Sequence, residues 1–206
     1  MAEQNTTDKL TLAKFEEAYD IVHKVVLPTK LIYSDYFSGI TGNKVYFKPE
    51  NLQKTGAYKI RGAYYKISTL SDEERQKGLI TASAGNHAQG VAYAAKAYGV
   101  KATIVMPSST PLIKVNRTKA YGAEVVLTDG TKGMKGAIEK ADELAKEIPN
   151  SFIAGQFVNP ANPETHKKTT GPEIWEDTDG KVDILVATSG TAGTITGLTK
   201  YLSLIH

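Results

Sequence analysis

From residue 79 onward, apolar runs of strand length alternate with segments in which apolar positions recur at helical spacing. The apolar runs cover residues 79–83, 100–106, 123–128, 151–157 and 182–188. Helical segments are predicted between or beside them, at 86–98, 111–121, 132–147 and about 163–178. Alternation of strands and helices with short connections is typical of βαβ units. The pattern predicts the α/β class, with parallel sheets flanked by helices.

The part of the chain before residue 79 shows a different mixture of elements. The expected elements are an amphipathic helix at 11–26, a short strand at 44–48 and a helix at 58–70. Ser71 and Glu74 have the spacing of a capping box, so a short helix should follow and end at Gly78. Further along, Thr110 as the cap and Pro111 at the first helical position predict the start of another helix.

Composition excludes several classes of function. The 206 residues are 41% hydrophobic and 23% charged, close to an ordinary globular protein. A net charge of +3 with interspersed signs predicts no nucleic-acid partner. The absence of cysteine excludes disulfides, thiolate metal sites and a cysteine nucleophile, and the four histidines lack metal-ligand spacing. Without a signal-peptide pattern or a membrane-length apolar run, no membrane association and a cytoplasmic location are expected.

The sequence "TASAGNHAQG" (81–90) places small residues between a predicted strand and a predicted helix. Ser83, Ala84 and Gly85 would let backbone amides approach a ligand, and the helix N-terminus adds partial positive charge. Asn86 and His87 add side-chain donors at the rim. Such a loop suits a carboxylate, although an ordinary capped turn between a strand and a helix explains it as well.

A second loop, "TSGTAGTITG" (188–197), has the same strand–loop–helix setting. Backbone amides and hydroxyls follow one another there, at Ser189, Gly190, Thr191, Ala192, Gly193 and Thr194. This arrangement suits a phosphate, which offers more acceptors than a carboxylate. The loop matches neither of the common glycine-rich nucleotide fingerprints, which makes a dinucleotide-binding oxidoreductase a weaker alternative. An ordinary turn is again the simpler alternative.

The sequence "KTGAYKIRGA" (54–63) raises the question of whether Lys59 is a solvated charge or a reactive amine. A lysine amine has an ordinary pKa of about 10.4 and must be partly desolvated to act as a nucleophile and a base. A carboxylate loop, a phosphate loop and a lysine among small residues are the groups that a pyridoxal phosphate enzyme requires. The sequence therefore predicts pyridoxal phosphate as the cofactor.

Two motifs carry a family resemblance. "ENLQKTGAYKIRGA" (50–63) and "SAGNHAQG" (83–90) resemble the threonine ammonia-lyase (threonine/serine dehydratase) branch of the fold-type II pyridoxal phosphate enzymes, and the likeness covers residues 10–125. The resemblance implies that Lys59 is the Schiff-base lysine and that Asn86 contacts the ring hydroxyl of the cofactor. It also implies that Ser83 to His87, including Ala84 and Gly85, bind the substrate carboxylate.

The second half of the chain is similar to a different branch. Residues 127–200 resemble cysteine synthase (O-acetylserine sulfhydrylase). The phosphate loop of that branch usually reads Gly-Thr-Gly-Gly-Thr, which matches Gly190, Thr191, Gly193 and Thr194 but has alanine at position 192. The methyl group of Ala192 is expected to weaken phosphate binding, by about 1 kcal/mol if the loop must shift. The chain thus resembles a mosaic of two branches.

The resemblance also predicts how the chain is organised. Residues 1–50 would form the N-terminal helix and first strand of a large domain, 51–160 a small βαβ domain, and 161–206 part of the large cofactor-binding domain. Family members continue beyond the last residues here, so the large domain is expected to be incomplete and to lack the Ser or Thr that binds the pyridine nitrogen. The strand at 182–188 would lie at an unfinished edge, which favours pairing with another chain and a homo-oligomer.

The expected function follows from the first loop, because that loop selects the substrate carboxylate. We expect β-elimination of a small amino acid, threonine or serine, to a 2-oxo acid and ammonia, with Lys59 taking the α proton. The second half favours a β-replacement on O-acetylserine, as in cysteine synthases. A folded fragment without catalytic activity is the alternative from another class.

Overall fold

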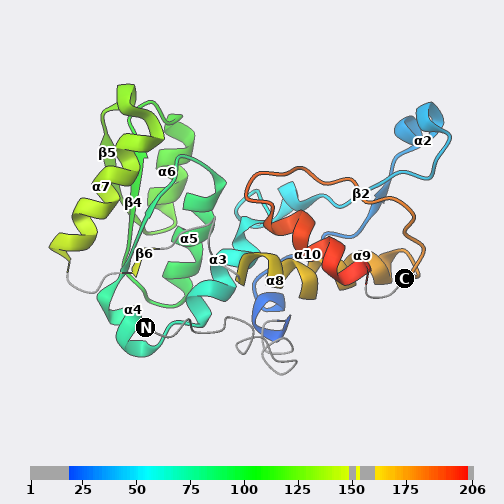
Figure 1. Ribbon diagram of the computed structural model, residues 1–206, viewed down its shortest axis with the longest axis horizontal. Coiled ribbons are helices and arrows are strands. Elements are labelled where there is room, and N and C mark those ends of the chain that lie inside the picture. Colours follow the sequence, from blue (N-terminus) through cyan, green and yellow to red (C-terminus); the bar gives the residue numbers. More distant parts are fainter. Residues whose placement is uncertain (1–18, 149–151, 154–160, 204–206) are drawn as a thin grey trace, which may run out of the picture.

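The computed structural model describes residues 19–148, 152–153 and 161–203. On one side of the molecule lies a four-stranded parallel sheet with the order β5-β4-β3-β6 (Figure 1). Its strands are β3 (Leu79–Ala82), β4 (Ala102–Pro107), β5 (Glu124–Thr128) and β6 (Phe152–Ile153). The helices of this side are α3 (Lys59–Ser68), α4 (Asp72–Lys77), α5 (Asn86–Ala97), α6 (Leu112–Ala120) and α7 (Gly133–Glu147). The predicted α/β class and parallel sheet are confirmed.

Both faces of this sheet are covered, as a parallel sheet requires. Leu79, Ile104 and Met106 belong to the larger core, which α3, α5 and α6 complete. The alternate positions Ile80 and Val105 pack instead against α7. Because successive side chains of a strand point to opposite faces, this alternation holds helices on both sides of the sheet and leaves the strand ends open to loops.

The predicted helix ends are confirmed in one place and wrong in another. Ser71 and Glu74 form the expected capping box, and Gly78 follows α4 with a positive φ of 76°. At α6, however, Pro111 has a ψ of 131° and is the cap, while the helix begins at Leu112. Thr110 therefore does not cap the helix. The first turn is closed by the N–H of Lys114, which donates to the Pro111 carbonyl at 2.9 Å.

The other side of the molecule holds the remaining helices and a small antiparallel sheet (Figure 1). Three of these helices, α8 (Ala161–Lys168), α9 (Thr170–Asp177) and α10 (Gly193–Leu202), come from the end of the described chain. Strands β1 (Ile32–Tyr33) and β2 (Tyr46–Phe47) pair there. Helix α2 (Asp35–Thr41) connects them along the chain, and the short helical turn η2 (Glu50–Leu52) follows β2. A second short turn, η3 (Gly130–Lys132), precedes α7 on the side of the parallel sheet. Of the helix predicted at 11–26, residues 19–23 are helical and the earlier part lies outside the described residues.

The single helix expected at 163–178 is interrupted. It divides into α8 and α9 at Thr169, just ahead of Pro172 in the first turn of α9. Proline has no N–H to donate and its ring collides with the carbonyl four residues earlier, so the turn that would join the two helices cannot be continuous. The break is confined to Thr169, the one residue between the two helices.

The strand predicted at 182–188 does not form within the described residues. The backbone there is irregular, and Ile184 and Val186 are 75% and 90% exposed. A β-strand requires hydrogen bonds to a neighbouring strand, and the described strands pair elsewhere in the molecule. An apolar run alone predicts a strand only where a partner is available. Of the strand predicted at 151–157, residues 152–153 form β6, and residues 151 and 154–157 lie outside the described part.

Among the described residues, no helix combines the length and apolar character that crossing a membrane would need.

Candidate active site

Lys59 is the first residue of α3. Its side chain is half-buried, with Nζ 5.8 Å from the centre of the Tyr58 ring. Burial lowers the pKa of the Lys59 amine from its ordinary value, because water no longer fully stabilises the charged form. The predicted lysine is thus neither a solvated surface charge nor a fully enclosed one.

The backbone of Lys59 lies against α5, the helix that follows the loop of residues 81–85. A Cβ atom on Gly90 would lie 3.2 Å from both the carbonyl carbon and the carbonyl oxygen of Lys59. Glycine at this position therefore allows close packing of the two helices. Asn86, the first residue of α5, is four residues before Gly90 and so lies on the same face of the helix. Local packing thus brings Asn86 to the α3 side of its helix, one turn from the contact with Lys59.

The loop at residues 83–85, before α5, is hydrogen-bonded to the sheet on one side and has open space on the other. Ser83 is buried; its N–H donates to the Val105 carbonyl at 3.0 Å, and its hydroxyl accepts from the Gly85 N–H at 3.3 Å. Ala84, Gly85 and His87 are half-buried and Asn86 is exposed. No atom lies within 4 Å of where a Gly85 Cβ would be, so the loop has open space beside its backbone. This is the geometry in which main-chain donors can reach a small anion.

The second loop is tied to α3 through Asn162 of α8. The Asn162 Nδ2 atom donates to the Thr191 hydroxyl at 3.0 Å, and a Cβ on Gly193 would collide with Nδ2 at 2.3 Å. On its other side Asn162 meets α3, because a Cβ on Gly62 would lie 3.1 Å from Oδ1. The Asn162 side chain is therefore packed closely between α3 and Gly193, the first residue of α10. Since Gly62 is one helical turn after Lys59, the loop is held beside the start of α3.

His166 forms a second link between the loop and α3. It is 1% exposed, with Nδ1 2.9 Å from the Thr170 hydroxyl and Nε2 3.2 Å from the Thr194 hydroxyl. Its ring makes an edge contact with Tyr58, the residue before Lys59, at 5.4 Å between centroids. Burial, with the positive charges of Arg61 and Lys59 adding to it, lowers the pKa of His166 to about 3. His166 is therefore neutral and serves as an uncharged hydrogen-bonding core residue.

The residues of the second loop present donors toward open space. The Thr191 hydroxyl accepts from Asn162 and, at 3.4 Å, from the Gly193 N–H, so its own hydrogen remains available to donate. No atom lies within 4 Å of where a Gly190 Cβ would be. The first N–H groups of α10 have no intrahelical acceptor, and the helix dipole is positive at this end. This donor set fits a phosphate group.

Ala192 departs from this fit in its backbone. It has φ 59° and ψ 0°, the left-handed conformation that favours glycine, and it caps α10 without a side-chain hydrogen bond. The backbone of Ala192 is therefore strained. Its methyl group also stands where the cysteine synthase branch usually has glycine.

Replacing Ala192 with glycine is expected to raise the free energy of unfolding of the cofactor-free chain by about 1 kcal/mol, because left-handed backbone costs alanine roughly that much. Urea unfolding measures it, and the affinity for pyridoxal phosphate should rise in the same variant. Ala97→Gly, at an exposed helical alanine of α5, is the control and should lower stability. A loss of stability in Ala192→Gly like that of the control would contradict the strain.

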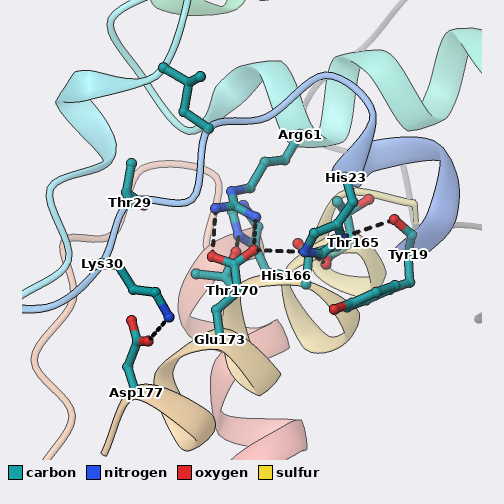
Figure 2. Close-up of polar contacts among 12 residues, drawn as sticks. Tyr19, His23, Thr29, Lys30, Arg61, Thr165, His166, Thr170, Glu173 and Asp177 are labelled. Atoms are coloured by element: carbon teal, nitrogen blue, oxygen red, sulfur yellow. Dashed lines mark hydrogen bonds and ion pairs between the residues drawn. The ribbon is translucent and has the colours of Figure 1, made fainter.

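A buried ionic cluster beside α3 was not assigned any role by the sequence motifs. Figure 2 shows the Arg61 guanidinium facing the Glu173 carboxylate of α9. Arg61 also binds Glu50, and all three groups are largely removed from water. Glu50 and Arg61 stand in the quoted motif at 50–63, but Glu173 is 112 residues from Arg61 in sequence. Other charged residues also occur on α3 and α9, so the sequence carries no local signal that selects these three.

The fold and these contacts define a class of protein: an α/β protein with a half-buried lysine at the start of a helix that packs against α5 and, through Asn162, against the loop before α10. Comparisons with known proteins give the same class. The model of the family described as "Pyridoxal-phosphate dependent enzyme" matches residues 22–206. The chain belongs to this family of pyridoxal phosphate-dependent enzymes, and the predicted cofactor and fold type are confirmed at that level.

Particular relatives come from both branches that the motifs indicated. L-threonine ammonia-lyase of Thermotoga maritima is 45% identical over 193 residues, covering 92% of this chain and 46% of the relative. Cysteine synthase A of Escherichia coli is 50% identical over 125 residues, covering 60% of this chain and 39% of the relative. The structure of maize serine racemase superimposes with a TM-score of 0.85 at 31% identity, covering 94% of this chain and 57% of that one. The chain thus spans less than half the length of these two curated relatives.

Proposed function

We propose that this chain supplies the lysine and the anion-binding loops of a pyridoxal phosphate-dependent lyase that acts on threonine or serine. The reaction would be β-elimination of the hydroxyl group as water, followed by release of a 2-oxo acid and ammonia. The observation that carries the proposal is the half-buried Lys59 at the start of α3, a helix that packs against α5 and is linked to the second loop through Asn162. The similarity to a threonine ammonia-lyase over 92% of the chain supports this choice of reaction.

Each loop is given a role by its donors. Gly190 to Thr194 would hold the cofactor phosphate with main-chain N–H groups and the two threonine hydroxyls. Ser83 to His87 would hold the substrate carboxylate, with Asn86 also contacting the ring hydroxyl of the cofactor. When bound, the cofactor supplies an electron sink that makes the α proton of an amino acid acidic. The protein groups then need only orient the substrate and move protons.

Lys59 would accept the α proton at its Nζ atom. Because burial lowers the pKa of Lys59, a larger fraction of the amine is unprotonated near neutral pH than for a solvated lysine. A positioned base of this kind typically accelerates a reaction by about 10²–10⁴-fold. The hydroxyl group on the β carbon leaves as water once it receives a proton. The protonated Lys59 amine can return the proton that it took from the α carbon.

A second candidate reaction is β-replacement on O-acetylserine, which would give cysteine when sulfide is added. Its support is the 50% identity to a cysteine synthase over 60% of the chain. A third possibility is a folded fragment without activity. We also infer that residues 51–160 form a small βαβ domain, that 161–206 contribute to the cofactor-binding domain, and that the protein assembles as a homo-oligomer.

The reaction is tested by comparing products. We expect 2-oxo acid release from threonine or serine to exceed cysteine formation from O-acetylserine and sulfide, with pyridoxal phosphate present in both assays. Predominant cysteine formation would contradict elimination and favour replacement. Absence of both products, in a chain that still binds the cofactor, would support the inactive fragment.

A further inference from the structure

Arg61 is the largest of the fully buried side chains in the described part of the protein, at 0% exposure. It lies on α3, two residues after Lys59. Its Nε and Nη2 atoms donate to Glu50 at 2.8 Å each, and Nη1 and Nη2 donate to Glu173 at 2.7 and 2.9 Å. Arg61, Glu50 and Glu173 are named here the Arg61 clamp. Bidentate contacts to two carboxylates fix both the position and the plane of the guanidinium.

The two carboxylates of the clamp are themselves held from other parts of the chain. Glu50 accepts from the Thr29 hydroxyl and, at 3.2 Å, from the Gln53 amide. Burial opposes ionisation of Glu50, but these hydrogen bonds and those from Arg61 outweigh it and lower its pKa. Glu173 is paired with Lys48 at 2.6 Å. The clamp therefore joins α3 to α9 and to the segment around η2.

The clamp and Lys59 lie on opposite sides of the same helix. Residues two apart in an α-helix are separated by about 200° around the axis. The side of α3 that carries Arg61 is fixed by the two carboxylates. The Lys59 backbone, by contrast, is fixed by close packing against Gly90 of α5. A Cβ atom at position 90 would lie only 3.2 Å from the Lys59 carbonyl group. Since Lys59 is on α3, a rotation of the helix would change how far its half-buried side chain is exposed.

We propose that Arg61 is a positioning residue for Lys59: the Arg61 clamp sets the rotation of α3 so that the Lys59 amine stays half-buried between the two loops. The inference rests on the proposed role of Lys59 as the reactive amine. It assigns to the clamp a function beyond holding the fold. A structural clamp would affect stability alone, whereas a positioning clamp also changes the environment of the Lys59 amine.

The environment of Lys59 can be measured without cofactor or substrate. Trace acetylation with acetic anhydride, quantified on the Lys59 peptide by mass spectrometry across a pH series, gives the pH midpoint of its amine. Burial lowers the pKa of Lys59, so the midpoint of the wild-type chain should lie below that of an exposed lysine. Weakening the clamp should let α3 rotate, rehydrate the amine and move the midpoint to higher pH.

Two carboxylates of α9 provide a matched pair of variants. Glu173→Gln removes a charge that binds Arg61, whereas Asp177→Asn removes a similarly buried charge, one turn later, that binds Lys30 at 2.8 Å and the Leu31 N–H at 3.1 Å. We expect the Lys59 midpoint to rise in Glu173→Gln and in Glu50→Gln, and to be unchanged in Asp177→Asn. Thr29→Val, which only removes a hydroxyl donor to Glu50, should cause a smaller rise and tests the same point if a charge variant loses its fold.

The outcomes separate this inference from the proposed function. A wild-type Lys59 midpoint equal to that of an exposed lysine would count against the reactive amine itself. A lowered wild-type midpoint that stays the same in folded Glu50→Gln, Glu173→Gln and Thr29→Val would overturn the positioning role and leave the clamp as a purely structural device. An equal rise in Asp177→Asn would also overturn it, because the effect would then come from any loss of charge on α9.

Discussion

Replacing Lys59 with alanine is expected to abolish the visible absorption that develops when the chain forms its lysine adduct with pyridoxal phosphate. The amine is the group that bonds to the cofactor aldehyde in the proposed function, and the alanine variant offers none at this position. Lys66→Ala is the matched control, because Lys66 is also a half-buried lysine on α3. We expect its spectrum to equal that of the wild-type chain.

The same replacement should lower 2-oxo acid release by at least about 10²-fold, the smallest effect typical of losing a positioned base. Loss of the covalent attachment adds to that of the base, so Lys59→Ala is the variant with the largest expected effect on activity. An absorption band of equal intensity in the Lys59→Ala and Lys66→Ala variants would contradict the assignment. It would show that cofactor reacts with other lysines of the chain.

Replacing Arg61 with methionine is expected to lower the free energy of unfolding by about 3–5 kcal/mol, the range for removing one partner of a buried ion pair. Arg61 is fully buried, and the side chains of Glu50 and Glu173 are only 12% and 14% exposed. The substitution leaves two largely buried carboxylates, of which Glu173 keeps its contact with Lys48. Denaturant unfolding of the cofactor-free chain measures the loss.

Lys30→Met is the control for this prediction, because Lys30 forms an ion pair with Asp177 but its side chain is 80% exposed. We expect little change in this variant, since solvent screens such a pair. A similar loss in the two variants would show that burial of the Arg61 clamp contributes nothing.

The clamp also sets a direction for pH dependence. Because the pKa of Glu50 is lower in the folded chain than its ordinary value of 4.5, its contribution to stability is complete above that pH. The contribution is lost as the pH falls through the folded value. The difference in stability between wild type and Arg61→Met should therefore shrink only in acid.

Much of the sheet could be predicted because its signals are local. Periodicity gave the strands and helices of the βαβ units, and small residues ahead of a predicted helix gave the two loops, the first of which follows β3. The capping box at Ser71 and Glu74 formed as expected, since both partners lie within one turn. Lys59 and both loops were found as motifs, and the structure places the Lys59 helix beside each of them.

The features that sequence alone did not give depend on distant partners. Nothing local to Arg61 indicates that Glu173 will face it, 112 residues later. Asn162 and His166 join the loop at 188–197 to the start of α3 through contacts of the same long-range kind. The apolar run at 182–188 was misassigned because a strand also needs a neighbour. The break at Thr169 could have been predicted from Pro172.

The most direct test of the account is to find where the cofactor attaches. The chain would be incubated with pyridoxal phosphate, reduced with borohydride and digested, and the modified peptides identified by mass spectrometry. The account predicts one dominant modified site, Lys59, at substoichiometric cofactor. Modification spread over the exposed lysines in proportion to their accessibility, with Lys59 no more reactive than Lys66, would contradict it.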